Sequence, residues 1–167
     1  MPEARHVVGL ALVAGLGAAL VGGFAAWPDY RRLADDLAII KLSIAHEGQR
    51  LAPCRTLTEA ELAALPKHKR TAEDCPRGRH PVTVEVRLDD AVLFATTETP
   101  TGWAGDGPSR FYGRATVPAG DHTLTLRLRD TGRADGFDRQ ETASVHLRPG
   151  QIAVVGFDGE RGAFVIR

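Results

Sequence analysis

The sequence predicts a mainly β protein, in which a single N-terminal transmembrane helix is followed by an antiparallel β-sandwich. Three observations support this prediction: an unbroken apolar run near the N-terminus, a two-residue alternation of apolar and polar side chains from residue 38 onward, and turn-forming residues between the alternating runs. We expect an anchor over residues 1–30 and a β domain over residues 31–167, with an insertion at 47–80.

The composition is that of a folded protein without a dominant charge. The 167 residues include 21 basic and 21 acidic side chains, so the chain lacks the broad positive field on which nucleic-acid binding draws. Charged residues make up 25% and apolar residues 43% of the chain, which is ordinary for a folded domain. We therefore expect no nucleic-acid partner.

The apolar run extends from Val7 to Trp27 without a charged side chain. A helix of this length spans about 31 Å, close to the hydrocarbon thickness of a bilayer. Trp27 and Tyr30 follow at the position where aromatic rings favour the headgroup region, and Pro28 ends the helix. The run therefore predicts a membrane anchor.

A cleaved signal peptide is the alternative interpretation, because Gly23 and Ala25 are small residues that suit a cleavage site. The flanking charges add a conflict, since Arg31 and Arg32 follow the helix and the positive-inside rule would place that side in the cytoplasm. The C-terminal position of the folded portion and the cysteine pair favour the opposite orientation. We expect a bacterial inner-membrane protein with a periplasmic C-terminal domain.

Small residues recur every fourth position along the predicted helix. Ala11, Gly15, Ala19 and Gly23 share one face, and small side chains at this spacing allow a second transmembrane helix to approach closely. The alternative is that alanine and glycine are simply common in this chain, which holds 18 glycines. The stripe predicts a helix-packing face.

Cys54 and Cys75 are the only cysteines, and they bracket a segment that is poorly able to hold itself together. A disulfide closing this loop in an oxidising compartment contributes about 3 kcal/mol on the chain-entropy estimate. A zinc site is the rival interpretation, but neither cysteine has a CxxC or CxxH neighbour. A redox pair is a further alternative, which the sequence leaves open. We expect a structural disulfide between Cys54 and Cys75.

The segment between the cysteines begins with a helix signature. Thr58 and Glu61 form a capping box, and Pro66 ends the helix at Leu65. Leu62 and Leu65 are spaced to lie on one face of this helix, and we expect them to pack it onto the β domain.

A basic run follows this helix. Lys67, Lys69 and Arg70 surround His68, and we interpret them as a contact for anionic lipid headgroups or an acidic partner surface. The alternative is a solvated loop with no partner.

The β domain is predicted from alternation and from turns. Apolar residues alternate with polar ones over 40–44, 82–88, 122–129 and 143–147, as in antiparallel strands with one buried face. Turn residues separate these runs at 89–90, 118–121, 148–151 and 158–159. About eight short strands at this spacing indicate an immunoglobulin-like or related sandwich. The Cys-Trp-Cys signature of true immunoglobulin domains is missing, so the likeness is architectural.

One connection is irregular. The loop between Glu98 and Ser109 is rich in glycine and proline and contains Trp103. A tryptophan in such a loop is either a partner-contacting anchor or a cap that folds back over the end of the sandwich. The sequence does not separate these two interpretations.

No catalytic or cofactor motif is present. The six histidines form no paired ligand pattern, and there is no GxSxG elbow or phosphate loop. Asp130, Asp135 and Asp138 resemble a calcium loop only loosely, because the DxDxDG spacing and its closing glutamate are missing. We therefore expect a protein that is not an enzyme and that binds no metal or cofactor.

These features together favour a non-catalytic accessory subunit or assembly factor, which docks on a larger membrane protein complex such as a respiratory or photosynthetic one. Its expected partners are subunits of that complex, contacted through the helix and the β domain, and the lipid bilayer. The alternative is an envelope binding module, whose sandwich recognises a glycan, a peptide or another envelope component through the loop at 98–109 or a sheet edge.

Overall fold

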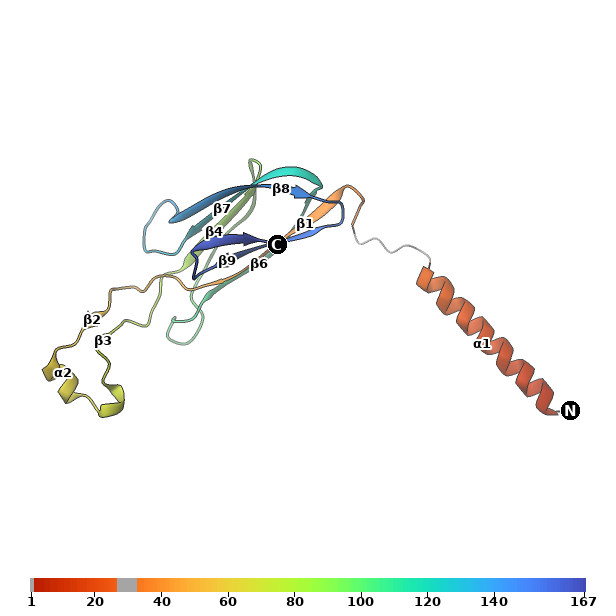
Figure 1. Ribbon diagram of the computed structural model, residues 1–167, viewed down its shortest axis with the longest axis horizontal. Helices are drawn as coiled ribbons and strands as arrows, with labels where there is room; N and C mark the ends of the chain where they lie inside the picture. The colour runs from red at the N-terminus through yellow and green to blue at the C-terminus, as the bar shows by residue number, and fades with distance from the viewer. Residues whose placement is uncertain (1, 27–32) are drawn as a thin grey trace. The chain divides into compact units, whose positions relative to one another are not determined.

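The computed structural model describes residues 2–26 and 33–167 (Figure 1). The predicted interfacial residues Trp27 and Tyr30, the predicted helix end Pro28, and the flanking Arg31 and Arg32 lie outside the described residues. The chain divides into two units, Met1–Ala34 and Asp35–Arg167.

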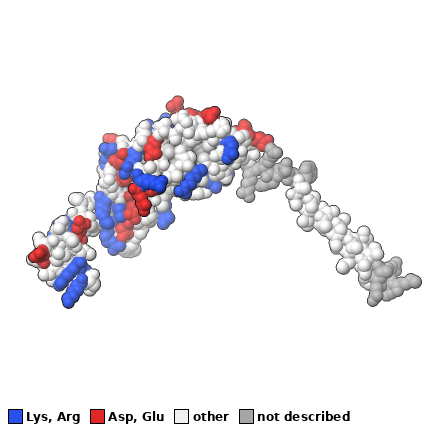
Figure 2. Space-filling view, viewed as in Figure 1, with Lys and Arg blue, Asp and Glu red and all other residues white. Residues whose placement is uncertain are grey.

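The first unit contains helix α1, Pro2–Ala26. Its segment His6–Ala26 has a mean hydropathy of 2.2 and is long and apolar enough to cross a membrane, a property that anchors and signal sequences share. Its described side chains carry no charge, so the helix is white along that length in Figure 2. The four small residues of the predicted packing face are all exposed: Ala11, Gly15, Ala19 and Gly23.

The second unit is built from strands, as predicted. Its elements are β1 (Leu37–His46), β2 (Arg55–Thr56), α2 (Glu59–Ala64), the 3-10 turn η1 (Lys67–Lys69), β3 (Glu73–Asp74), β4 (Val82–Leu88), β5 (Ala91–Glu98), β6 (Ser109–Pro118), β7 (Gly120–Arg129), β8 (Arg139–Leu147), β9 (Ile152–Asp158) and β10 (Ala163–Ile166). Within the described residues, β10-β9-β1-β6 form one four-stranded sheet, here sheet A, and β5-β4-β7-β8 form another, sheet B. Strands β2 and β3 pair separately.

The two-residue alternation directs apolar side chains from both sheets into one core. In β4 every second residue is buried, from Val82 to Leu88, while the residues between them are only partly covered. The core cluster takes Ile40 and Leu42 from β1 of sheet A and Leu126 from β7 of sheet B. Each such side chain contributes about 1.5–3 kcal/mol when fully buried. The alternation therefore identified the buried faces correctly.

The expectation of purely antiparallel sheets is wrong for sheet A, which is mixed. Strand β1 pairs with β6 antiparallel but with β9 parallel, with Ile39 opposite Ile152 and Leu42 opposite Val155. The parallel pair arises because the chain leaves sheet B after β8 and returns to sheet A beside β1. Alternation shows which side chains face the core, and it carries no information about the direction of the neighbouring strand.

The register of the strands gives the β domain two unlike ends. At the end where β1 begins, which we call the turn end, strands are joined by short turns at 89–90, 119 and 148–151. At the end where β1 finishes, which we call the loop end, lie the connections 47–81, 99–108, 130–138 and 159–162. His46 at the end of β1 is opposite Ser109, where the second of these connections closes.

Candidate interaction surface at the loop end

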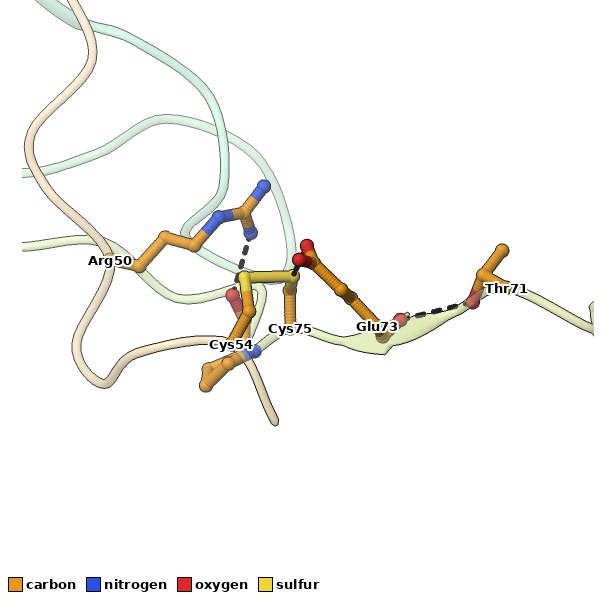
Figure 3. Close-up of a disulfide and its surroundings, with 6 residues drawn as sticks. Arg50, Cys54, Thr71, Glu73 and Cys75 are labelled. Carbon is orange, nitrogen blue, oxygen red and sulfur yellow. Dashed lines mark hydrogen bonds between the residues drawn. A yellow bond between two sulfur atoms is a disulfide. The ribbon is translucent and has the colours of Figure 1, made fainter. Parts of the chain in front are cut away.

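The largest connection of the loop end, 47–81, consists almost entirely of an arm, residues 47–80, which projects from the β domain in Figure 1. Across its base, Cys54 and Cys75 form the predicted disulfide, and β2 pairs with β3 beside it. Arg50 Nη1 donates a hydrogen bond of 2.7 Å to the carbonyl oxygen of Pro76, on the returning segment of the arm (Figure 3). The arm is therefore closed covalently and by backbone contacts near its root.

The arm helix α2 is held by polar contacts and packs on no core. Glu61 N donates to Thr58 Oγ1 and Thr58 N donates to Glu61 Oε2, which confirms the predicted capping box. Arg55 Nη1 lies 2.6 Å from Glu61 Oε1. The hydrogen bond from Arg55 and those from Thr58 lower the pKa of Glu61 to about 2. No residue of α2 is buried, so the expected packing of Leu62 and Leu65 onto the β domain is wrong.

The residues of the predicted basic patch, Lys67, Lys69 and Arg70, have two different roles. Arg70 Nε donates to the carbonyl oxygen of Leu65 at 2.9 Å, and its Nη2 donates to that of Ala63 at 3.2 Å. Arg70 therefore closes the C-terminal end of α2. Lys67 and Lys69 are exposed and have no ion-pair partner among the described residues, and Figure 2 shows blue side chains at the end of the arm.

The connection 99–108 carries Trp103, which is fully exposed and does not fold back over the domain. The arm braces this loop at its base. Arg77 Nε donates to Asp106 Oδ2 at 2.9 Å, and Arg79 Nε donates to the carbonyl oxygen of Asp106 at 3.1 Å. The hydrogen bond from Arg77 holds the pKa of the Asp106 carboxyl below its ordinary value. Gly105, at φ 60°, allows the tight turn next to the tryptophan.

The connection 130–138 is closed by its own aspartates. Asp138 Oδ2 accepts hydrogen bonds from the backbone N–H groups of Asp130 and Thr131, at 2.9 and 3.2 Å. Burial raises the pKa of Asp138, but these bonds, the Thr131 hydroxyl and the charge of Arg133 outweigh it and lower the pKa below its ordinary value. Asp138 therefore ties the loop to itself.

Asp130 joins this loop to β1 and to the arm. Its Oδ2 lies 2.8 Å from His46 Nε2, and the two side chains are only 9% and 13% exposed. Its carbonyl oxygen accepts a hydrogen bond of 2.8 Å from the backbone N–H of Gln49, at the start of the arm. The ring of His46 also meets that of Phe157 edge to face, with 4.7 Å between centroids. These contacts anchor the arm, the β7–β8 loop and β1 to one another.

In the described part of the chain, one group of side chains has potential metal-ligand atoms close together. Ligand atoms of Cys54, Glu73 and Cys75 lie within 4.8 Å of one another. The two sulfur atoms are bonded to each other, so neither is a thiolate that could ligate a metal. The group is described best as a disulfide with a nearby carboxylate.

The structure brings the predicted contact residues to one end of the domain but not into a single cluster. Trp103 lies on one connection, while Lys67 and Lys69 lie on the arm, and Arg77 with Asp106 joins the two segments. The sequence interpretation missed this ion pair and the pair of His46 with Asp130. Both join residues far apart in the chain, and no local pattern marks them.

Sequence interpretation also missed a cationic face, although a signal for it was present. Arg110, Tyr112 and Arg114 alternate with inward residues over β6, and the same two-residue period that identified the core places them together on the outer surface of sheet A.

Comparison with known proteins gives no match: no protein family fits the chain, and no curated protein is measurably similar to it.

Proposed function

We propose that the protein is a non-catalytic, single-pass membrane-anchored accessory subunit or assembly factor that docks on a larger membrane protein complex. In this proposal α1 is a retained anchor in a bacterial inner membrane, and the β domain is an immunoglobulin-like sandwich on the periplasmic side. A respiratory or photosynthetic complex is the type of partner proposed.

The observation that carries the proposal is the full exposure of Trp103 on a braced loop. A tryptophan side chain buries 150–250 Å² when a partner covers it, which corresponds to about 4–6 kcal/mol of transfer free energy. The contacts from Arg77 and Arg79 fix the loop before any partner arrives, so little ordering entropy opposes binding. An indole presented in this way has the properties of an interface hot spot.

The anchor helix supplies a second contact in this proposal. A Cβ added to Gly15 or Gly23 would meet nothing within 4 Å, so the helix surface is open at these positions. Small residues spaced in this way support close helix packing in a bilayer. The partner would therefore hold both a transmembrane helix and an extramembranous surface.

The first test is the variant Trp103→Ala in the full-length tagged protein, purified in mild detergent from its native host. We expect stoichiometric membrane subunits with the native chain and their loss with the variant, by about tenfold to a hundredfold in affinity. Ile152→Ala is the matched control, because it shortens an exposed apolar side chain at the turn end. Retention of the subunits by Trp103→Ala would contradict docking through the loop end, as would a native chain that purifies alone.

The second test places leucine at Gly15 and Ala19 together. We expect the inserted variant to lose its partner subunits, because larger side chains block close helix approach. The control carries Gly17→Leu with Val21→Leu on the opposite face of the helix and keeps its partners. Equal co-purification of both variants would remove the helix from the proposal.

A second candidate function uses the same tryptophan. In an envelope binding module, the exposed ring of Trp103 stacks on an apolar sugar face or fills a pocket of a peptide partner. Calorimetric titration of the full chain with soluble envelope glycans separates the candidates. Binding that is lost in Trp103→Ala would favour the module, whereas no binding together with co-purified subunits would favour the accessory subunit.

A further inference from the structure

The outer surface of sheet A carries a cationic and aromatic stripe, which we call the basic face. Arg110, Tyr112 and Arg114 alternate outward along β6, and Lys41 on β1 lies directly opposite Arg114. The two arginines are exposed, and the tyrosine is 79% exposed. Outward residues two apart on a strand are about 7 Å from each other, so the stripe from Arg110 to Arg114 is about 13 Å long.

The cations of the basic face have no acidic partner among residues 2–26 and 33–167. Among the described residues, Lys41, Arg110 and Arg114 take part in no ion pair. The acidic residue at the end of the same outer surface is Asp158, and it accepts hydrogen bonds from the backbone N–H groups of Glu160 and Arg161 in its own turn. The positive charge of this surface is therefore left uncompensated.

The outer surface of sheet B shows the opposite arrangement. Glu85 on β4 lies directly opposite Arg127 on β7, and Arg127 Nη1 is 2.9 Å from Glu85 Oε1. Arg87 Nη1 lies 3.8 Å from the same oxygen. Opposite charges across a strand pair stabilise a sheet, whereas like charges directly opposite destabilise it. Lys41 opposite Arg114 is a pair of the second kind, so the stability of the fold does not explain it.

We propose that the basic face binds the anionic headgroups of a lipid bilayer, with Tyr112 seated at the headgroup level. This inference rests on the membrane anchor of the proposed function. An exposed sheet face can lie against a flat surface, and a cation near an anionic leaflet contributes about fivefold to association. Tyrosine favours the same interfacial depth.

Chain connectivity favours a bilayer over an acidic protein as the occupant. Helix α1 ends at Ala26 and β1 begins at Leu37. The residues between them span at most about 35 Å even when fully extended, so an anchored chain keeps its β domain close to a lipid surface. Tethering of this kind gives an effective concentration in the millimolar range, at which a few cations are sufficient.

The experiment uses the full chain in nanodiscs that contain a trace of lipid with a paramagnetic headgroup. One set is made of phosphatidylcholine and the other of phosphatidylcholine mixed with phosphatidylglycerol. In the anionic discs, we expect selective broadening of the amide signals of Lys41, Tyr112 and Arg114, and recovery at high salt because the charges are then screened. The neutral discs give little broadening.

Two variant pairs complete the experiment. Arg110→Gln with Arg114→Gln reduces the ratio of lipid-bound to free domain by about thirtyfold. The control, Arg87→Gln with Arg129→Gln, removes the same charge from sheet B and leaves this ratio unchanged. Arg114→Glu abolishes the broadening while keeping or raising Tm, because it places an acid opposite Lys41.

Equal broadening in neutral and anionic discs, or broadening that survives Arg110→Gln with Arg114→Gln, would overturn the inference. An acidic protein as the true occupant gives the same negative result, since no lipid contact then forms. Failure of the native chain to insert into any nanodisc would instead overturn the proposed anchor. Insertion of the chain without broadening would contradict lipid binding by the basic face and would leave the proposed anchor unaffected.

Discussion

Both ends of the β domain contain histidine–aspartate pairs, and the exposure of these pairs differs. At the turn end, His146 Nδ1 lies 2.7 Å from Asp121 Oδ1, and the two side chains are 65% and 91% exposed. At the loop end, His46 and Asp130 are 2.8 Å apart and are 13% and 9% exposed. A second turn-end pair, His122 Nδ1 with Asp89 Oδ2 at 2.9 Å, has an enclosed histidine and an exposed aspartate, at 12% and 57%. Of these three pairs, only that of His46 with Asp130 has both partners enclosed.

The backbone contacts of the two ends differ in the same way. At the turn end, adjacent turns are closed by main-chain bonds, such as Ala119 N to Asp36 O and Gly150 N to Leu37 O, both 2.8 Å. At the loop end, main-chain bonds such as Gln49 N to Asp130 O are joined by side chains from distant parts of the sequence, such as Arg77 on Asp106. Turn geometry is sufficient where connections are short, and polar contacts between distant segments are added to it where they are long.

The largest expected effect comes from replacing Cys54 and Cys75 together with serine. The bridge joins residues separated by 21 positions, and its loss lowers the stability of the arm by about 3 kcal/mol on the chain-entropy estimate. The core lies in the two large sheets, so the arm opens by itself. Native-state hydrogen exchange checks this by faster exchange in β2, α2 and β3 with unchanged exchange in β4 and β7. Loosening of the whole domain, or an unaffected arm, would contradict the prediction.

The second prediction compares the most enclosed and the most exposed of the histidine–aspartate pairs. Asp130→Ala leaves the enclosed imidazole of His46 without its partner and destabilises the domain by about 1–3 kcal/mol. Asp121→Ala removes an exposed partner of His146 and changes stability by no more than about 0.5 kcal/mol. Urea denaturation of both variants measures the difference. Equal losses would show that the enclosure at the loop end has no energetic consequence.

The turn end was largely predictable from the sequence, because its determinants are local. The residue types at 89–90 and 148–151 predict turns by themselves, and Gly150 takes the positive φ of 74° that its turn needs. Alternation predicted the core for a similar reason, since the apolar positions within a single strand identify the face that it buries. The parallel pairing of β1 with β9 was missed because strand direction depends on the path between sheets.

The loop end was predictable only in its local parts. The capping box was predictable because Thr58 and Glu61 are three residues apart. The disulfide was predictable because the chain has only two cysteines. The contact of Asp106 with Arg77 and that of Asp130 with His46 join separate connections, so they exist only once the fold is formed. The expected packing of Leu62 was wrong because helical spacing shows that a face is apolar, without showing that a surface lies opposite it.

The third prediction concerns the N-terminal cap of α2. Thr58→Ala removes the hydroxyl that accepts from Glu61 N and costs the helix about 1 kcal/mol. Because α2 buries no residue, the loss stays within the arm, and denaturation of the β domain is unchanged. Amide exchange of residues 59–64 measures the effect. Serine at position 58 is the control, since it keeps the hydroxyl and restores the protection.

The smallest predicted effect is the acid response of the arm. The pKa of Glu61 is lowered from 4.5 to about 2, first by the hydrogen bond from Arg55 and then by those from Thr58. A lowered pKa means that the stabilising contribution of the carboxylate is complete above pH 4.5 and is lost as the pH falls through about 2. The NMR chemical shifts of the α2 amides should therefore stay constant from pH 6 to pH 4 and change only near pH 2. Arg55→Gln should move this transition upward toward the ordinary value, because the largest cause of the shift is gone. A midpoint that stays near 2 in that variant would assign the shift to the Thr58 cap, and the arm would then depend on its cap more than on its ion pair.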